Sequence, residues 1–134
     1  MNQIIKFNSD ISNIALAENL VDLISERNEI SDELYGNILI SLTEAVSNAI
    51  THGNKHDLNK NVEINYEIDN NLLKINVKDE GIGFDYNNLP DPTSPENIEK
   101  FNGRGIFLIK NLADIVFFNQ VGNEITLFFN ILKD

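Results

Sequence analysis

The sequence predicts an α+β fold, a two-layer sandwich in which a mainly antiparallel sheet carries helices on one face. Three observations predict it. Apolar residues recur at three- and four-residue steps in residues 11–27 and 32–51. They then alternate with polar residues in 62–69 and 73–77. All three prolines fall in one long polar stretch, residues 84–102, after which a helix and two strands complete the order expected for such a sandwich.

The N-terminal half is predicted to hold a short strand and two helices. Residues 4–8 form the strand, and the apolar positions of residues 11–27 lie on one face of the first helix. Ser31 is a good N-cap for the second helix, residues 32–51, because a serine hydroxyl accepts a hydrogen bond from a free backbone N–H group. Gly53 matches the position after a helix, where a left-handed backbone favours glycine.

The C-terminal half is predicted to hold a hairpin, a short helix and two further strands. The hairpin has one buried and one solvated face, and it turns at Asn70 and Asn71, which tolerate positive φ. Residues 84–102 form a loop too long for a simple connector, and such loops in compact domains are usually functional. The remaining elements are a helix over 104–113 and strands over 115–119 and 124–132.

Composition limits the classes of function. The 134 residues, 42% of them hydrophobic, fit one domain, residues 1–134, with one core. A net charge of −11 makes nucleic acids and anionic membranes poor partners. The absence of cysteine excludes disulfides, thiolate zinc sites and thiol catalysis. The sequence shows no signal peptide and no apolar run near the ~20 residues of a membrane span, so we expect a cytoplasmic protein.

Glu44 and Asn48 stand one helical turn apart on the second predicted helix, so their side chains share one stripe. An amide oxygen of Asn48, with nucleotide phosphates, would suffice for Mg²⁺, which prefers oxygen ligands and keeps several waters. Glu44 could accept a proton from an attacking hydroxyl or water. His52 continues the stripe, and we expect a structural role for it. The pair is equally compatible with an ordinary solvated helix edge.

Asp79 follows the second strand of the hairpin, with Gly81 and Gly83 behind it. A buried carboxylate at a strand end is unfavourable unless donors meet it, and the exocyclic amine of adenine is such a donor. The glycines would let the backbone turn sharply and approach a flat ligand closely. A simple turn without a ligand has the same sequence, so that alternative stays open.

Gly103, Arg104 and Gly105 precede an apolar helix. Free N–H groups at a helix start form an anion site, and Arg104 adds a positive charge for a γ-phosphate or a protein partner. The segment is not a Walker A loop, because no Gly-Lys-Ser/Thr follows, and a flexible helix entry remains the alternative. Taken together and in this order, the three motifs indicate a purine nucleotide site with Mg²⁺ at its phosphate end.

These motifs resemble those of the GHKL superfamily, the ATP-binding domains of DNA gyrase, heat-shock chaperones, histidine kinases and mismatch-repair ATPases. Over nearly its whole length the chain is similar to the bacterial anti-sigma-factor serine/threonine kinase branch. The resemblance implies a Bergerat-type ATP-binding fold in which residues 84–102 form an ATP lid. It also implies that Glu44 is the catalytic base, that Asn48 coordinates Mg²⁺ and that Asp79 binds adenine. The other nucleotide-binding residues would be Gly81, Gly83, Gly103, Arg104, Gly105 and Thr126.

The resemblance implies an ATP-dependent protein serine/threonine kinase that acts as an anti-sigma or partner-switching regulator. Its partners would be a small antagonist protein, which it phosphorylates, and a sigma factor, and it could form a homodimer. Three alternatives remain: a non-catalytic module whose affinity for a partner is set by nucleotide, a histidine-kinase-like catalytic domain that acts in trans, and an acidic domain without a ligand.

Overall fold

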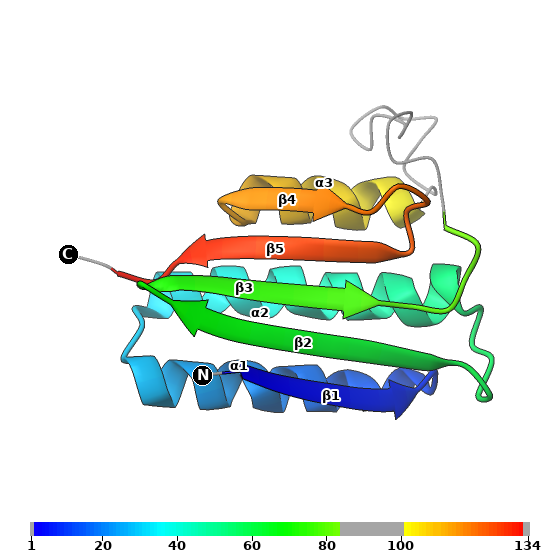
Figure 1. Cartoon of the computed structure of the whole chain (residues 1–134), viewed down its shortest axis with the longest axis horizontal. Coiled ribbons are helices and arrows are strands. Elements are labelled where there is room, and N and C mark those ends of the chain that lie inside the picture. The colour runs from blue at the N-terminus through cyan, green and yellow to red at the C-terminus, as the bar shows by residue number, and fades with distance from the viewer. Residues whose placement is uncertain (1, 84–100, 133–134) are drawn as a thin grey trace.

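Five strands form one antiparallel sheet in the order β1-β2-β3-β5-β4, and the helices lie on one of its faces (Figure 1). The structure, a computed structural model, describes residues 2–83 and 101–132, with side chains for 3–83 and 105–132. The strands are β1 (Asn2–Asn8), β2 (Asn61–Asp69), β3 (Leu72–Lys78), β4 (Ile115–Phe118) and β5 (Glu124–Asn130). The helices are α1 (Ile14–Asn28), α2 (Asp32–Asn48) and α3 (Phe101–Leu112), with a 3₁₀ turn η1 (Ile11–Asn13) and a π-helical turn η2 (Ala49–Gly53). The predicted α+β sandwich is confirmed.

The predicted hairpin is present as β2 and β3, which pair from Asp69 opposite Leu72. Asn70 and Asn71 have φ of 51° and 64°. Positive φ at both central residues defines the type I′ turn, whose twist matches the twist of the flanking strands. The hairpin and its turn at the two asparagines are therefore as predicted.

The helix boundaries follow local signals at the end of α1 and the start of α2, and they depart from them at the end of α2. The Ser31 hydroxyl accepts a hydrogen bond from the Leu34 N–H (3.1 Å), so the predicted N-cap of α2 is confirmed. Glu29, in the left-handed conformation at φ 50°, ends α1. At the other end of α2 the chain tightens into η2, and Gly53 lies inside this turn without a positive φ. The prediction of a left-handed Gly53 was therefore wrong, because the left-handed residues come later, at Lys55 and His56.

The hydrophobic core lies between the helices and the inward face of the sheet. α2 runs between α1 and α3 behind the middle strands (Figure 1). Its Ile38 and Leu42 side chains are fully buried, as are Ile75 of β3 and Leu127 of β5. Burying such side chains is the main favourable contribution to folding. This packing holds the C-terminal end of α2 against the end of β3, where the sequence motifs meet.

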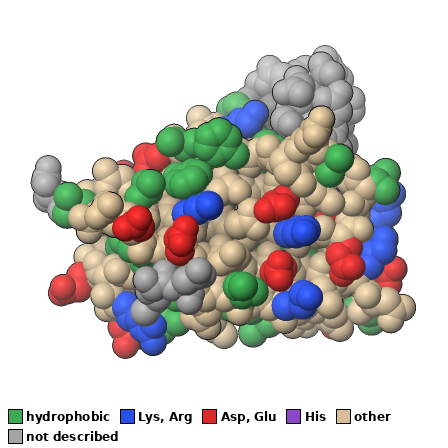
Figure 2. All heavy atoms as spheres, in the orientation of Figure 1, with side chains coloured by type: hydrophobic (Ala, Val, Ile, Leu, Met, Phe, Trp, Pro, Cys, Tyr) green, Lys and Arg blue, Asp and Glu red, His purple; other side chains and the backbone are tan. Residues whose placement is uncertain are grey.

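The opposite face of the sheet has no helix over it in the described residues. Its charged side chains are Lys6, Lys74, Lys78, Glu63, Glu67, Asp69 and Glu124, so it is close to neutral on a chain of net charge −11. Figure 2 shows the two charges interspersed on this face and hydrophobic side chains gathered toward the β4 edge. We call this surface the open face.

Two further predictions concern the lid and membrane-spanning segments, and for both the structure speaks only of the described residues. Of the predicted lid, residues 84–100 lie outside the described residues, and residues 101–102 begin α3. Among the helices that are described, none has the length and apolar character needed to span a bilayer.

Candidate functional site

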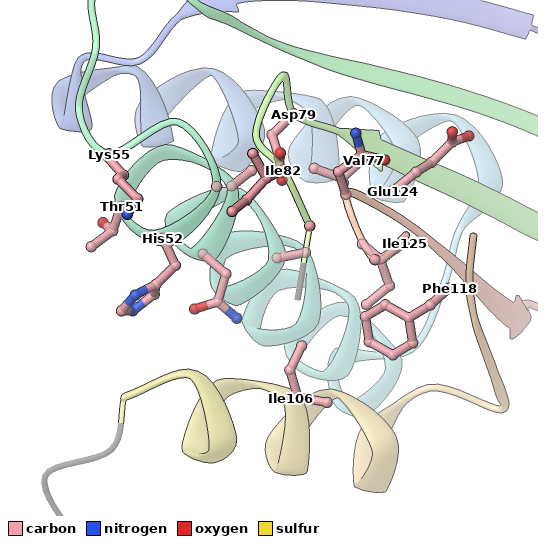
Figure 3. Close-up of a pocket in the computed structure, with 17 residues that line it drawn as sticks. Thr51, His52, Lys55, Val77, Asp79, Ile82, Ile106, Phe118, Glu124 and Ile125 are labelled. Carbon is pink, nitrogen blue, oxygen red and sulfur yellow. The ribbon is translucent and has the colours of Figure 1, made fainter. Parts of the chain in front are cut away.

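A cleft of about 400 Å³ opens where α2 and η2 end, between the loop after β3, the first turns of α3 and the β4–β5 turn. Its volume lies in the range of about 300–1,000 Å³ typical of small-molecule sites. Figure 3 shows Asp79 and Ile82 on the loop after β3, with Ile106 of α3 on the opposite side of the cleft. The cleft lining thus contains Asn48 of the first motif, Asp79 and Gly83 of the second, and Ile106 directly after the third.

The walls of the cleft are largely apolar, with polar groups at separate positions. The apolar lining consists of Ala45, Ala49, Val77, Ile82, Ile106, Phe118 and Ile125. Polar side chains come from Asn48, Thr51, His52, Lys55, Asp79, Asn123 and Glu124. An apolar slot with a few polar groups suits a flat heteroaromatic ring, since the ring faces are apolar and its edges form hydrogen bonds.

Asp79 lies at the end of β3 with its carboxylate turned into the cleft wall. The Asp79 N–H donates to the Asn123 carbonyl (3.0 Å), and the Gly81 N–H donates to Asp79 Oδ1 (2.7 Å). Burial raises the pKa of the Asp79 carboxyl above its ordinary value, and the Gly81 hydrogen bond opposes this only in part. A buried carboxylate of this kind would be stabilised by a donor from a bound molecule.

Three glycines allow the backbone to close around Asp79. A Cβ atom on Gly53 would overlap the Asp79 carboxylate, and one on Gly81 would overlap the Gly53 carbonyl. Gly83 has a φ of 87°, and a Cβ there would overlap the Val121 carbonyl. Gly81 and Gly83 were predicted as site residues. Gly53 joins them for a reason that a helix-end pattern cannot reveal, namely the close approach of a distant carboxylate.

Glu44, Asn48 and Gly105 lie close together, and Asn48 lines the cleft, whereas Glu44 and Gly105 are not among its described lining residues. A Cβ atom on Gly105 would lie 2.9 Å from Asn48 Nδ2 and 3.1 Å from Glu44 Oε2, so the glycine lets α3 pack directly on both side chains. Both polar atoms of the Asn48 amide are buried, and neither has a hydrogen-bond partner among the residues that the structure describes. A buried amide without partners is unfavourable by about 1–3 kcal/mol per group, and such groups often mark ligand sites.

The chain around Gly103 and Arg104 differs from the predicted loop. α3 begins at Phe101, so both residues lie in its first turns and the predicted helix start at residue 104 was too late. Gly105 lies inside this helix although glycine is a poor helix former. Its close packing on α2 requires a residue without a side chain. The Arg104 side chain lies outside the described side chains.

The structure does not bring Thr126 to the cleft. Its neighbours Ile125 and Leu127 are buried beneath the helices, so strand alternation turns Thr126 to the open face. There its hydroxyl accepts a hydrogen bond from Asn76 Nδ2 (2.9 Å). Thr126 lines a second hollow of about 260 Å³, and Glu124 is a wall of both this hollow and the cleft.

His52 and Asn123 are among the cleft residues that were not predicted as part of the site. His52 lines the cleft, and burial together with the nearby His56 lowers its pKa, which favours the neutral imidazole. Its spacing of four from Asn48 was the available signal. Asn123 lines the cleft from the β4–β5 turn and donates through Nδ2 to the Gly81 carbonyl (3.2 Å). No local pattern links a late turn to the Asp79 loop, because the contact is tertiary.

The described residues contain no group of three or more His, Asp or Glu side chains that could hold a metal ion. A cation in the cleft would therefore take most of its ligands from a bound phosphate or from water. The buried Asn48 amide oxygen fits such a site, since it offers one oxygen that no protein donor occupies.

Comparison with known proteins agrees with this geometry. The chain belongs to the family described as "Histidine kinase-like ATPase domain", whose model matches residues 7–129. It is 36% identical over 81 residues to proteins named "Serine-protein kinase RsbW" from Bacillus cereus (strain AH820) and Bacillus anthracis, a match of 56% of this chain and 50% of each relative. The matched region thus spans about half the length of these curated relatives.

A solved structure supports the fold. The chain is similar, with a TM-score of 0.70 and 13% identity, to "the RsbU and RsbW domains of Rv1364c from Mycobacterium tuberculosis". The match covers 100% of this chain and 33% of that one. The resemblance of the motifs to the GHKL superfamily, and to its anti-sigma kinase-like branch, is confirmed by these likenesses.

Proposed function

We propose that this chain binds Mg²⁺-ATP in the cleft and transfers the γ-phosphoryl group to a serine or threonine of a small antagonist protein. One observation carries the proposal. The Asp79 carboxylate, whose pKa is raised by burial, lines the same largely apolar cleft as the Asn48 amide, which has no hydrogen-bond partner within the described part of the chain. The adenine amine of a bound nucleotide would donate a hydrogen bond to the Asp79 carboxylate. The cation that accompanies the nucleotide would bind the Asn48 amide oxygen.

Asp79 would recognise the base. Adenine presents an amine donor at the edge where guanine presents a carbonyl acceptor, so a carboxylate favours adenine and repels guanine. The absence of side chains at Gly81 and Gly83 would let the base lie close to the loop backbone. The apolar walls would contact the faces of the ring.

The phosphates would lie at the start of α3. Backbone N–H groups at a helix start attract anions, and Gly103 and Arg104 lie in the first turn of α3, where the arginine would add positive charge. Gly105 follows them and would bring this helix start close to Asn48. The Asn48 amide oxygen would be the protein ligand of Mg²⁺, which when bound neutralises phosphate charge. Glu44, which lies next to Gly105 as Asn48 does, would orient and deprotonate the serine or threonine hydroxyl of the antagonist.

Two measurements test this function. Calorimetry with ATP, ADP and GTP, with and without Mg²⁺, should show binding that prefers adenine and strengthens with the cation. Replacing Glu44 with Gln should keep ATP affinity while phosphotransfer to an antagonist falls by about 10²–10⁴-fold, the usual contribution of a general base. If transfer persists in the variant, Glu44 is not the base. If ATP binds and no side chain is phosphorylated, the chain is a nucleotide-dependent binding module, and a phosphohistidine product would indicate a histidine kinase.

Such a chain would work in the cytoplasm as a partner-switching regulator that alternates between the antagonist and a sigma factor. The relatives named serine-protein kinase RsbW support this role, since the chain is 36% identical to them over 81 residues. The sequence similarity spans about half of each relative, so the regulatory partners belong to the proposal.

We also propose that two copies pair through the open face. Ile115 and Phe117 of β4 are 48% and 57% exposed there, and the ring of Phe117 packs edge-on against Phe128 at 6.0 Å between centroids. Contiguous exposed apolar side chains usually mark an interface. A second copy suits this face because its charges nearly cancel, whereas the repulsion of a chain of net charge −11 disfavours contacts elsewhere.

A further inference from the structure

Asn54 is an almost fully buried polar residue outside the predicted nucleotide contacts. It is 1% exposed and follows η2, and the Ser9 side chain beside it is fully buried. The Asn54 Nδ2 group donates to Ser9 Oγ (2.9 Å) and to the Asn61 carbonyl (3.0 Å). The Ser9 hydroxyl in turn donates to the Lys60 carbonyl (2.7 Å). One amide therefore joins the end of β1, the start of β2 and the end of α2.

The remaining polar atom of Asn54 reaches the Asp79 loop. Asn54 Oδ1 accepts the Glu80 N–H at 2.7 Å. The N–H groups on either side are also held, since Asp79 N–H donates to the Asn123 carbonyl and Gly81 N–H to Asp79 Oδ1. Three successive backbone donors are thus fixed, and only the middle one depends on a side chain from another element.

The position of the Asp79 carboxylate follows from this arrangement. Oδ1 is held by Gly81, and the carboxylate fills the space that the absent side chain of Gly53 leaves. Asn54 comes directly after Gly53, so the hydrogen bond from the Glu80 N–H to Asn54 Oδ1 fixes the distance between the Gly53 backbone and the Glu80 peptide. A shift of this peptide would move the carboxylate either into Gly53 or out into the cleft.

We propose that Asn54, supported by Ser9, is a positioning residue that holds Asp79 for adenine recognition and so sets the preference of the cleft for ATP over GTP. The inference rests on the proposed function, because it concerns the same carboxylate. Asn is suited to this position since its amide both donates and accepts, and the structure uses both donors and the acceptor. Asp in its place would lose the donors and face the Asn61 carbonyl with a second acceptor.

The test compares the affinities for Mg²⁺-ATP and Mg²⁺-GTP by calorimetry in wild type and in Asn54→Ala. We expect ATP affinity to fall roughly tenfold, the effect of losing one hydrogen bond that supports a charged group, and the ratio of ATP to GTP affinity to fall with it. Ile24→Val, which trims a buried α1 side chain away from the cleft, serves as the destabilised control and should keep the wild-type ratio. If Asn54→Ala does not fold, Ser9→Ala takes its place, with the same direction of change expected.

An unchanged ratio of ATP to GTP affinity in a folded variant overturns the inference, even if overall affinity falls, because a merely structural residue would weaken both nucleotides alike. A ratio that falls equally in the Ile24→Val control also overturns it. The proposed function fails separately, if the wild-type protein does not bind Mg²⁺-ATP.

Discussion

At the scale of single residues, glycines of the same chain are required for different reasons. Gly83 and Gly122 have positive φ, which other residues adopt reluctantly. Gly53 has no such φ, and its side chain is excluded by the Asp79 carboxylate. Gly36, inside α2, has open space where a side chain would lie. In the sequence these four of the seven glycines look alike, and only the tertiary contacts separate their roles.

Alanine at two of these positions should therefore have opposite effects on the free energy of unfolding. Gly36→Ala should stabilise by about 1 kcal/mol, because alanine is the better helix former and nothing obstructs it. Gly53→Ala should destabilise by about 1–3 kcal/mol, as expected for overpacking, and should also weaken ATP binding by displacing Asp79. Urea denaturation measures the first quantity and calorimetry the second. Equal stabilities for the two variants would contradict the contact between Gly53 and Asp79.

Asp79 should make the ligand-free protein less stable as its carboxyl ionises. Burial raises its folded pKa above 3.8, so the folded state holds this proton more tightly than the unfolded chain. The ionised group thus lowers stability at pH above the folded pKa, and the loss disappears as pH falls below 3.8. Asp79→Asn should be more stable than wild type near neutral pH, with a difference that shrinks on acidification, while ATP binding weakens. Unfolding curves across this pH range, with a titration of ATP, would show a less stable variant if the burial argument is wrong.

At the scale of elements, local signals predicted the hairpin and the start of α2 but neither the end of α2 nor the start of α3. The hairpin needs only alternation and two turn residues, which neighbouring positions supply. The π-helical turn η2 and the early start of α3 depend on packing between α2, α3 and the Asp79 loop. A single-sequence pattern holds no information about such contacts.

The turn of the hairpin offers a direct test at this scale. Asn71→Gly should stabilise the fold by roughly 0.5 kcal/mol, because Asn-Gly is the preferred pair of a type I′ turn. Asn71→Val should destabilise it by about 1–2 kcal/mol, since a β-branched residue resists the φ of 64°. Thermal or urea unfolding of the two variants measures the difference, and similar values would mean that the turn relaxes to another type.

At the scale of the whole molecule, the sequence predicted the two layers, and of the predicted site residues Asn48, Asp79 and Gly83 line the cleft. Glu44 and Asn48 were predicted from their spacing of one helical turn, and Asp79 from its place directly after a strand. Thr126 was expected near the base from the family resemblance alone. The same alternation of apolar and polar residues that predicted the strand also indicates that Thr126 faces away from the cleft, because its neighbours Ile125 and Leu127 lie on the buried side.

The open face gives a test of the proposed pairing of two copies. Phe117→Asp should shift the protein from dimer to monomer, because it places charge in the apolar patch that would be buried. Phe107→Asp is the matched control, since Phe107 is 44% exposed on α3 in the helical layer and should leave the mass in solution unchanged. Sedimentation of both variants and of wild type decides the matter. A wild-type monomer at high concentration would remove the pairing.

Glu124 has one further consequence, because it lines both the cleft and the hollow on the open face of the sheet. Asn76 Nδ2 donates to its carboxylate (2.7 Å), so we expect a ligand in the cleft and a partner on the open face to influence each other through Glu124. If they do, ATP must change the dissociation constant of the dimer by the same factor by which dimer formation changes the affinity for ATP, because coupling between two binding equilibria is reciprocal. Dilution experiments with and without ATP measure this effect as a change in the dissociation constant of the dimer. An unchanged dissociation constant would show that the two sites are not coupled.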